Sequence, residues 1–192
     1  MREIVRMMVE DIKPYDSVES EHKKNSLNWI DGDEEIFRLE KPATPPKHLV
    51  SYFVLVDLKK GKLMLVDHIK AELWLPSGGH VEKDEHPKVT VQREIKEELM
   101  IDADLVFEEP IFLTETVTVG KTAGHTDVSL WYVVKANSEQ TLEYDAKEFN
   151  GYKWFSYQEI LNMPISELDP HMHRFTKKLI EILGSNLKET QE

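Results

Sequence analysis

The 192-residue sequence contains no cysteine and is poor in basic residues. The missing thiols exclude disulfides, thiolate zinc sites, iron–sulfur clusters and thiol nucleophiles, so any metal or covalent chemistry must use oxygen or nitrogen atoms. There are 24 Lys and Arg against 36 Asp and Glu, which gives a formal net charge of −12. An acidic surface of this kind repels phosphate backbones, and we therefore expect no long nucleic acid as a partner.

Long apolar runs are also missing, and the N-terminus illustrates this. Charged residues interrupt its first turns, at Arg2, Glu3, Arg6, Glu10 and Asp11. No stretch there is long enough for a signal peptide or a membrane span, so we expect a cytoplasmic protein with no membrane partner. Hydrophobic residues still make up 40% of the chain, which is enough for a core, and the length favours one domain with an appended segment.

The chain divides into four segments. Residues 1–40 predict a charged helical leader, in which a proline separates a first helix from a second over 18–30. The apolar residues of the first helix recur at near-helical spacing, at Ile4, Val5, Met8 and Ile12. Residues 41–47 form a proline-rich link that cannot continue a helix. The main domain is expected over 48–184, followed by a frayed tail over 185–192.

Strand and helix patterns alternate within the main domain. Apolar runs rich in β-formers predict strands over 48–58, 62–69, 105–118 and 127–135, with a short one ending at Phe155. Ser156 and Glu159 have the spacing of a capping box, and Pro164 closes the short helix that it opens. A last helix is expected from a cap at Asp169 to Gly184. The interleaving predicts a layered α/β domain with a mixed sheet.

Three glutamates lie close together on a predicted helix over 87–99. Its buried stripe is Val91, Ile95 and Leu99, and beside it Glu94, Glu97 and Glu98 fall within an arc of about 100°. Like charges at this spacing destabilise a helix, and acids in the last turn oppose its dipole. A hard divalent cation reverses that effect, because Mg²⁺ and Mn²⁺ prefer carboxylate oxygens.

The alternative is a solvated helix face whose acids are neutralised by Arg93 and Lys96. The upstream residues favour the metal site. Gly79 is followed after five residues by Glu85, and after seven more by Arg93-Glu94 and then Glu97-Glu98. Six fixed positions, at about one chance in fifteen each, match by accident roughly once in ten million windows. This pattern resembles the signature of the Nudix hydrolases.

The resemblance implies a Nudix-like α/β/α sandwich with a mixed sheet, the helical leader lying outside it. It further implies a Mg²⁺ or Mn²⁺ site held by Glu94, Glu97, Glu98 and the carbonyl oxygen of Gly78. Arg93 would orient the carboxylates, and Glu85 would brace the loop or join the outer metal shell. Glu94 is our first choice for the base. Glu148 is expected to be a further metal ligand or the alternative base, and it is equally expected to be an ordinary surface acid.

The implied activity is metal-dependent hydrolysis of a diphosphate linkage in a small nucleoside diphosphate-linked substrate. The leading candidate substrate is a nucleoside triphosphate. One form of this hypothesis is an oxidised nucleotide, whose hydrolysis would sanitise the nucleotide pool. The alternatives are a nucleotide-sugar or ADP-ribose diphosphatase and a non-catalytic nucleotide sensor. The motif glutamates Glu94, Glu97 and Glu98 are all present, which favours catalysis over the sensor. The leader has a further candidate role in a homodimer, because its apolar residues need a partner.

Candidate substrate-binding residues are less well marked. They are Gly79, His125, Phe53 and Trp74. Gly79 permits close approach to a ligand, and His125 follows a glycine-bearing loop that is placed to cover a substrate. The two aromatic rings could stack on a base, although core packing is the commoner role for such residues. His80 and His86 flank the motif and are expected to be ordinary loop residues.

Two backbone features are also expected near the motif. Ser77 to Gly79 are interpreted as a glycine-bearing loop, able to take conformations closed to other residues. Met100 stands where the family usually has a glycine with positive φ after the helix. A methionine takes that conformation only at a cost, so we expect the helix to run on or to end differently.

Overall fold

The computed structural model describes residues 1–41, 43–122 and 124–189. The helices are α1 (Arg2–Asp11), α2 (Ser17–Ile30), α3 (Pro87–Leu99), α4 (Tyr157–Asn162) and α5 (Met172–Glu189). The strands are β1 (Lys47–Asp57), β2 (Lys62–His68), β3 (Leu73–Leu75), β4 (Ser77–His80), β5 (Phe112–Val117), β6 (Thr126–Lys135) and β7 (Phe149–Ser156). Among the described residues, no helix is both long enough and apolar enough to cross a membrane.

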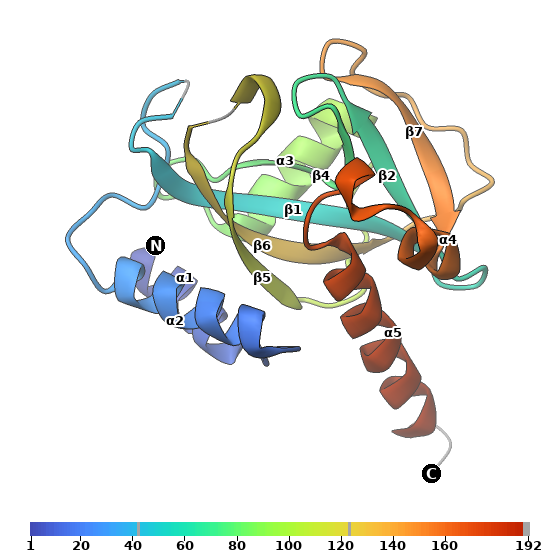
Figure 1. Ribbon diagram of the computed structural model, residues 1–192, viewed down its shortest axis with the longest axis horizontal. Helices are drawn as coiled ribbons and strands as arrows, with labels where there is room; N and C mark the ends of the chain where they lie inside the picture. The colour runs from blue at the N-terminus through green and yellow to red at the C-terminus, as the bar shows by residue number, and fades with distance from the viewer. Residues whose placement is uncertain (42, 123, 190–192) are drawn as a thin grey trace.

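The strands form one mixed sheet with the order β3-β2-β1-β6-β5. In addition β4 pairs with β1, and β7 pairs with β2. The pair β1–β6 is parallel, and the other strand pairs are antiparallel. Figure 1 shows α3 on one side of this sheet and α4 and α5 on the other. The α/β sandwich with a mixed sheet is therefore confirmed.

Strand alternation separates the apolar residues of β1 into two cores. Leu49, Phe53 and Leu55 face the side on which Ile95 and the rest of the α3 stripe are buried. Val54 and Val56 face the other side and belong to the cluster that includes α5. The helix that carries the glutamates is thus fixed on its apolar side by a strand that is buried at nine of its eleven residues.

The N-terminal leader packs on the edge of the sheet rather than standing apart. Val5 and Val9 of α1 are fully buried in the same cluster as Leu49. Helix α2 lies along the edge strand β5, where the Leu113 amide donates to Glu19 Oε1 (3.1 Å) and the Glu115 amide donates to a ring nitrogen of His22 (3.2 Å). Such contacts satisfy an edge strand that would otherwise be free to pair with another chain.

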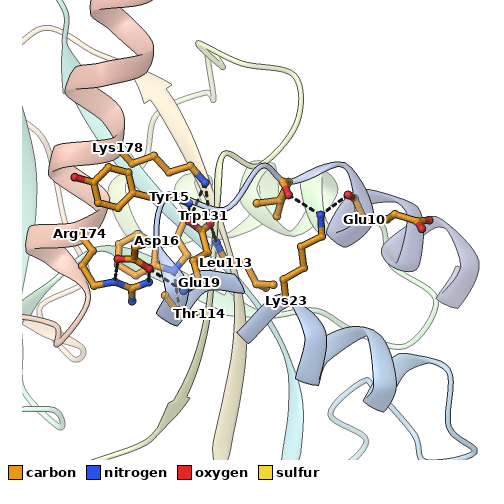
Figure 2. A network of polar contacts seen from close by, with 11 residues as sticks. Glu10, Tyr15, Asp16, Glu19, Lys23, Leu113, Thr114, Trp131, Arg174 and Lys178 are labelled. Atoms are coloured by element: carbon orange, nitrogen blue, oxygen red, sulfur yellow. Dashed lines mark hydrogen bonds and ion pairs between the residues drawn. The ribbon is translucent and has the colours of Figure 1, made fainter. Parts of the chain in front are cut away.

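Ion pairs join the leader to α5, as Figure 2 shows. Asp16 caps α2 by accepting from the Glu19 amide (2.9 Å) and receives two hydrogen bonds of 2.7 Å from Arg174. These bonds with Arg174, against a smaller opposing effect of burial, lower the pKa of Asp16 to about 2. Lys178 donates to both oxygens of the buried Glu19, at 2.8 and 3.0 Å. The apolar leader residues thus find a partner within their own chain.

Several predicted boundaries differ from the structure. The capping box of Ser156 and Glu159 is confirmed, with both reciprocal hydrogen bonds present. The run over 105–118 contains β5 over only its second half, and Leu105 forms an isolated bridge. The last helix was expected to start after Asp169, but Asp169 first forms a turn and α5 begins at Met172. It then continues through Gly184 to residue 189, so the helix does not end at Gly184 as expected; residues 190–192 of the expected tail lie outside the described residues.

Candidate catalytic site

The helix that carries the glutamates begins and ends at well-defined caps. His86 accepts the Lys88 amide through its side chain, and Pro87 occupies the first turn, where its missing N–H costs nothing. At the other end Met100 has φ 57° and ψ 26°, the left-handed conformation. The expectation that methionine would avoid this conformation was wrong. Its side chain is 52% exposed, and the strained backbone ends α3 where a glycine would.

The glycines before the helix lie in a strand, which corrects the predicted loop. Gly78 and Gly79 belong to β4 and pair with Tyr52 and Ser51 of β1. Neither glycine has a positive φ. A Cβ at Gly79 would lie 2.0 Å from Glu94 Oε1, and one at Gly78 would lie 2.4 Å from the Ser51 carbonyl oxygen. Glycine is therefore required because helix and strand approach each other closely here, not because of a special turn.

Arg93 holds the acids of this region in place. Its Nε and Nη2 donate to Glu85 at 3.1 and 3.0 Å, and its Nη1 donates to Glu94 Oε1 at 2.5 Å. Nη2 also reaches the His80 carbonyl oxygen at 3.3 Å. Thr90 donates to Glu85 as well (2.7 Å), and these bonds lower the pKa of Glu85 although burial acts in the opposite direction. Arg93 thereby links the loop, the helix and β4.

Glu94 and Glu98 are the buried acids of the helix. Their residual exposure is small, 14% for the Glu94 side chain and 6% for Glu98. Burial, followed by the nearby carboxylates of Glu94 and Glu148, raises the pKa of Glu98 to about 9. Burial also raises the pKa of Glu94, against the effect of Arg93. Oε2 of Glu98 is buried without a hydrogen-bond partner among the described residues.

Glu97 of α3 and Glu148, which directly precedes β7, both lie near Glu94. The Glu97 side chain is 62% exposed, with Oε2 3.8 Å from Arg93 Nη1. The Glu98 carbonyl oxygen accepts the Asp145 amide (2.9 Å), and the Asp145 carbonyl oxygen accepts the Glu148 amide (3.0 Å). This turn anchors Glu148 near the end of α3, within electrostatic reach of Glu94 and Glu98. The charged residues predicted from the motif and from the later segment thus surround one point.

The donor set fits a divalent cation. Several carboxylates face one another in a partly buried site, and one oxygen of Glu98 has no partner among the described residues. Without a cation, the raised pKa values of Glu94 and Glu98 mean that protonation relieves the repulsion between neighbouring carboxylates. Carboxylate oxygens are the ligands that Mg²⁺ and Mn²⁺ prefer. The arrangement can therefore bind such an ion and place it beside a substrate phosphate.

The predicted substrate residues are dispersed. Phe53 is 1% exposed in the core, so its ring is not accessible to a base, which corrects that expectation. Trp74 is half-buried and packs edge-on against Phe155, with ring centroids 5.5 Å apart. Gly79 lies against Glu94, as described above. His125 contacts His48 and Asp127 and not the three glutamates of α3.

Two features near this site were not predicted from the sequence. Arg38, in the leader, is half-buried within electrostatic reach of Glu94 and Asp127. His48, His80, His125 and Asp127 form a cluster of side chains whose ligand atoms lie within 4.8 Å of one another. No local spacing could have revealed this cluster, because its members come from β1, from β4 and from β6 with the residue directly before it, which the fold brings together.

Comparisons with known proteins agree with the geometry. The family model described as NUDIX domain matches residues 47–179. An RNA pyrophosphohydrolase of Hydrogenovibrio crunogenus is 23% identical over 152 residues, covering 65% of this chain and 90% of the relative. The MutT protein of Methanosarcina mazei has a TM-score of 0.55 at 20% identity, over 69% of this chain and 92% of the other.

A further solved structure is the NUDIX domain of Shewanella oneidensis NrtR in complex with ADP-ribose. It has a TM-score of 0.55 at 20% identity, over 70% of this chain and 87% of the other. These structural likenesses establish the fold. The matched family model, which spans more than half of the chain, shows that the chain belongs to the Nudix family. Its class is that of the Nudix pyrophosphohydrolases, which act on nucleotide-linked substrates and generally use a divalent metal ion.

Proposed function

We propose that this protein hydrolyses a diphosphate linkage in a nucleoside triphosphate, with oxidised nucleotides as one candidate class, using Mg²⁺ or Mn²⁺ and an attacking water. The observation that carries the proposal is the buried pair Glu94 and Glu98, with Glu148 close by and one Glu98 oxygen left without a partner among the described residues. A purely structural helix gains nothing from such an arrangement.

The residues of the candidate site would have different roles. The metal ligands we assign are Glu94, Glu97, Glu98, Glu148 and the carbonyl oxygen of Gly78. When bound, the ion would neutralise the diphosphate and stabilise the charge of the transition state. Arg93 occupies Oε1 of Glu94, so Oε2 is the oxygen we assign to the ion or to the attacking water. Glu94 would accept the proton of that water, with Glu148 as the alternative base, and Glu85 keeps Arg93 in place.

Two other functions have specific support. The ADP-ribose complex of the Shewanella domain favours an ADP-ribose or nucleotide-sugar diphosphatase as the alternative substrate class. The Hydrogenovibrio relative is an RNA pyrophosphohydrolase, which makes a 5′-triphosphorylated RNA a useful test compound, although the net charge of −12 opposes a long RNA. A nucleotide sensor would bind without turnover.

The test is a turnover screen of the full chain with Mg²⁺ or Mn²⁺. The panel holds nucleoside triphosphates, oxidised deoxyguanosine triphosphate, ADP-ribose, nucleotide sugars and a short 5′-triphosphorylated RNA. We expect Glu98→Gln to reduce turnover by about 10³-fold while circular dichroism stays unchanged. Glu167→Gln, an exposed acid of the 3₁₀ helix Ile165–Glu167, is the matched control and should retain activity. Wild-type turnover in Glu98→Gln would refute the metal assignment.

A further inference from the structure

The histidine cluster lies on the sheet face opposite α3. The parallel pairing of β1 and β6 places His48 directly beside Asp127, and His125 precedes Asp127 by two residues. The antiparallel pairing of β1 and β4 places His80 opposite Val50, two residues from His48. Because side chains alternate along a strand, those of His48, His80 and Asp127 point to one face. The closeness of these three is therefore fixed by regular backbone pairing, and His125 joins them from the position directly before β6.

The polar atoms of this cluster face one another without the usual hydrogen bonds. His48 is fully buried, and its Nε2 lies 3.3 Å from Asp127 Oδ1. The Nε2 of His125 lies at the same distance from the same oxygen. Nevertheless, Nε2 of His48, Nε2 of His80 and Oδ1 of Asp127 are buried atoms with no hydrogen-bond partner among the described residues. Three unpartnered polar atoms at one point form a costly arrangement unless something binds between them.

The second ring nitrogens determine which atoms face the centre of the cluster. Nδ1 of His48 lies 2.8 Å from the Pro45 carbonyl oxygen, which can only accept, so Nδ1 carries the proton in the neutral ring. Thr118 Oγ1 lies 3.1 Å from the His125 carbonyl oxygen and 3.2 Å from Nδ1 of the same residue. In the tautomer that carries the proton on Nδ1, each of the two rings presents the lone pair of Nε2 to Asp127. Carbonyl and hydroxyl partners of this kind orient metal-binding histidines.

His80 contributes the third ring, whose centroid lies 4.7 Å from that of His48 and whose Nε2 is buried without a hydrogen-bond partner among the described residues. Neutral imidazole is the form that coordinates metals. A tetrahedral ion with bonds of about 2.0 Å separates its ligand atoms by about 3.3 Å. The separations of 3.3 Å between Asp127 Oδ1 and Nε2 of the two histidines match that value, and all four ligand atoms lie within 4.8 Å of one another.

We propose that His48, His80, His125 and Asp127 form a second metal site, which binds one Zn²⁺ or a similar divalent transition-metal ion. Three imidazole nitrogens and one carboxylate oxygen suit such ions, whereas the oxygen-only glutamate site suits Mg²⁺. Four protein ligands complete a tetrahedral shell, so the ion is structural. It would tie the starts of β1 and β6 to the end of β4. Through the His80 carbonyl oxygen it would also steady Arg93.

Co²⁺ is the probe, because tetrahedral Co²⁺ absorbs visible light strongly. The full chain, stripped with a chelator, is titrated with Co²⁺ and then with Zn²⁺. We expect one equivalent of tetrahedral Co²⁺, its displacement by Zn²⁺, and a rise in melting temperature. In ¹⁵N NMR of the wild-type protein, Zn²⁺ should shift the Nε2 resonances of three histidines. Glu98→Gln should retain this site, which separates it from the proposed catalytic ion.

Asp127→Asn and His80→Gln should each weaken binding by at least about 100-fold. His173→Gln is the matched control, because that ring contacts the Met163 carbonyl oxygen outside the cluster and should leave binding unchanged. Two results would overturn the proposal. One is a folded wild-type chain that gives neither the tetrahedral spectrum nor the NMR shifts, which would leave a histidine hydrogen-bond network. The other is an undiminished spectrum in both Asp127→Asn and His80→Gln, which would place the ion elsewhere.

Discussion

Glu19 and Glu98 are both buried glutamates on helices, yet their surroundings are opposite in kind. Glu19 accepts hydrogen bonds from Lys178 and from the amides of Tyr15 and Leu113, as Figure 2 illustrates for the leader. Glu98 faces Glu94 and Glu148 and has one oxygen with no partner among the described residues. The first carboxylate is satisfied by the protein itself. The second is satisfied only by a proton or a cation.

The difference separates contacts that hold the fold together from contacts that fit the proposed metal site. Around Glu19 the contacts join elements that are distant in sequence, namely the leader, β5 and α5. Around Glu98 the contacts concentrate like charges, which costs stability in the absence of metal. Buried carboxylates are therefore informative only together with their partners. The histidine cluster likewise contains buried atoms without hydrogen-bond partners among the described residues, which supports the second metal site proposed there.

The largest effect on stability is expected from Lys178→Met. It leaves the charge of Glu19 buried without its cation, and breaking such a pair costs about 3–5 kcal/mol. Glu98→Gln in metal-free buffer should be neutral or stabilising, because it removes repulsion. Urea unfolding of both variants with a chelator present measures the contrast, with the exposed Lys177→Met as control. Equal losses in Lys178→Met and Glu98→Gln would remove the distinction between the two glutamates.

Leu99→Ala tests the contribution of core packing at the residue next to Glu98, separately from the proposed metal binding. Leu99 is fully buried, and its truncation should cost about 3 kcal/mol through lost burial and a cavity. Turnover per folded molecule should stay close to wild type at low temperature. Val89→Ala, at a 47% exposed position of the same helix, is the matched control and should change little. A Leu99→Ala protein of full stability would contradict the packing described for α3.

The pH dependence of stability should single out Glu98. Its pKa is about 9 in the folded chain against an ordinary value of 4.5 for a glutamate side chain, so the folded state binds the extra proton between these values. The free energy of unfolding therefore falls as the pH rises through that window, by at most about 1.4 kcal/mol per pH unit. Glu98→Gln removes this dependence. The difference between wild type and Glu98→Gln, measured by urea unfolding without metal, should thus change steadily with pH, and a constant difference would count against the raised pKa.

The smallest expected effect is a gain of about 1 kcal/mol in Met100→Gly, because glycine adopts the left-handed backbone without strain. Met100→Ala is the control. It keeps the Cβ that causes the strain, and we expect no comparable gain. Thermal unfolding measures both. Equal melting temperatures for the two variants would show that the conformation of residue 100 is not a source of strain.

The sheet, the helix of the glutamates and the capping box at Ser156 could be predicted from the sequence, because they depend on local periodicity and cap chemistry. The end of the last helix could not. Gly184 has no positive φ, and helix α5 passes through it, so the residue type alone did not define a stop. Likewise Met100 adopts a conformation that its residue type disfavours, because the chain must turn after α3.

The motif spacing led to the charged residues of the candidate site, since Arg93 and the glutamates lie on one helix. It did not lead to the role of Gly79, whose importance is its contact with Glu94 from a neighbouring strand. His48 and Asp127 are adjacent only through the parallel pairing of β1 and β6. The spacing of residues along the sequence does not show which strands pair. The assigned roles of the individual residues stay predictions until the variants are measured.

The most direct test is the melting temperature of wild type and Glu98→Gln at about pH 8 during titration with Mg²⁺ or Mn²⁺, where binding to the folded state alone raises stability. The protein is first saturated with Zn²⁺, and the excess is removed, to exclude binding at the His48 cluster. The account predicts a rise in wild type that saturates and a nearly flat response in Glu98→Gln. The same rise in both proteins would contradict the claim that Glu98 is completed by a cation.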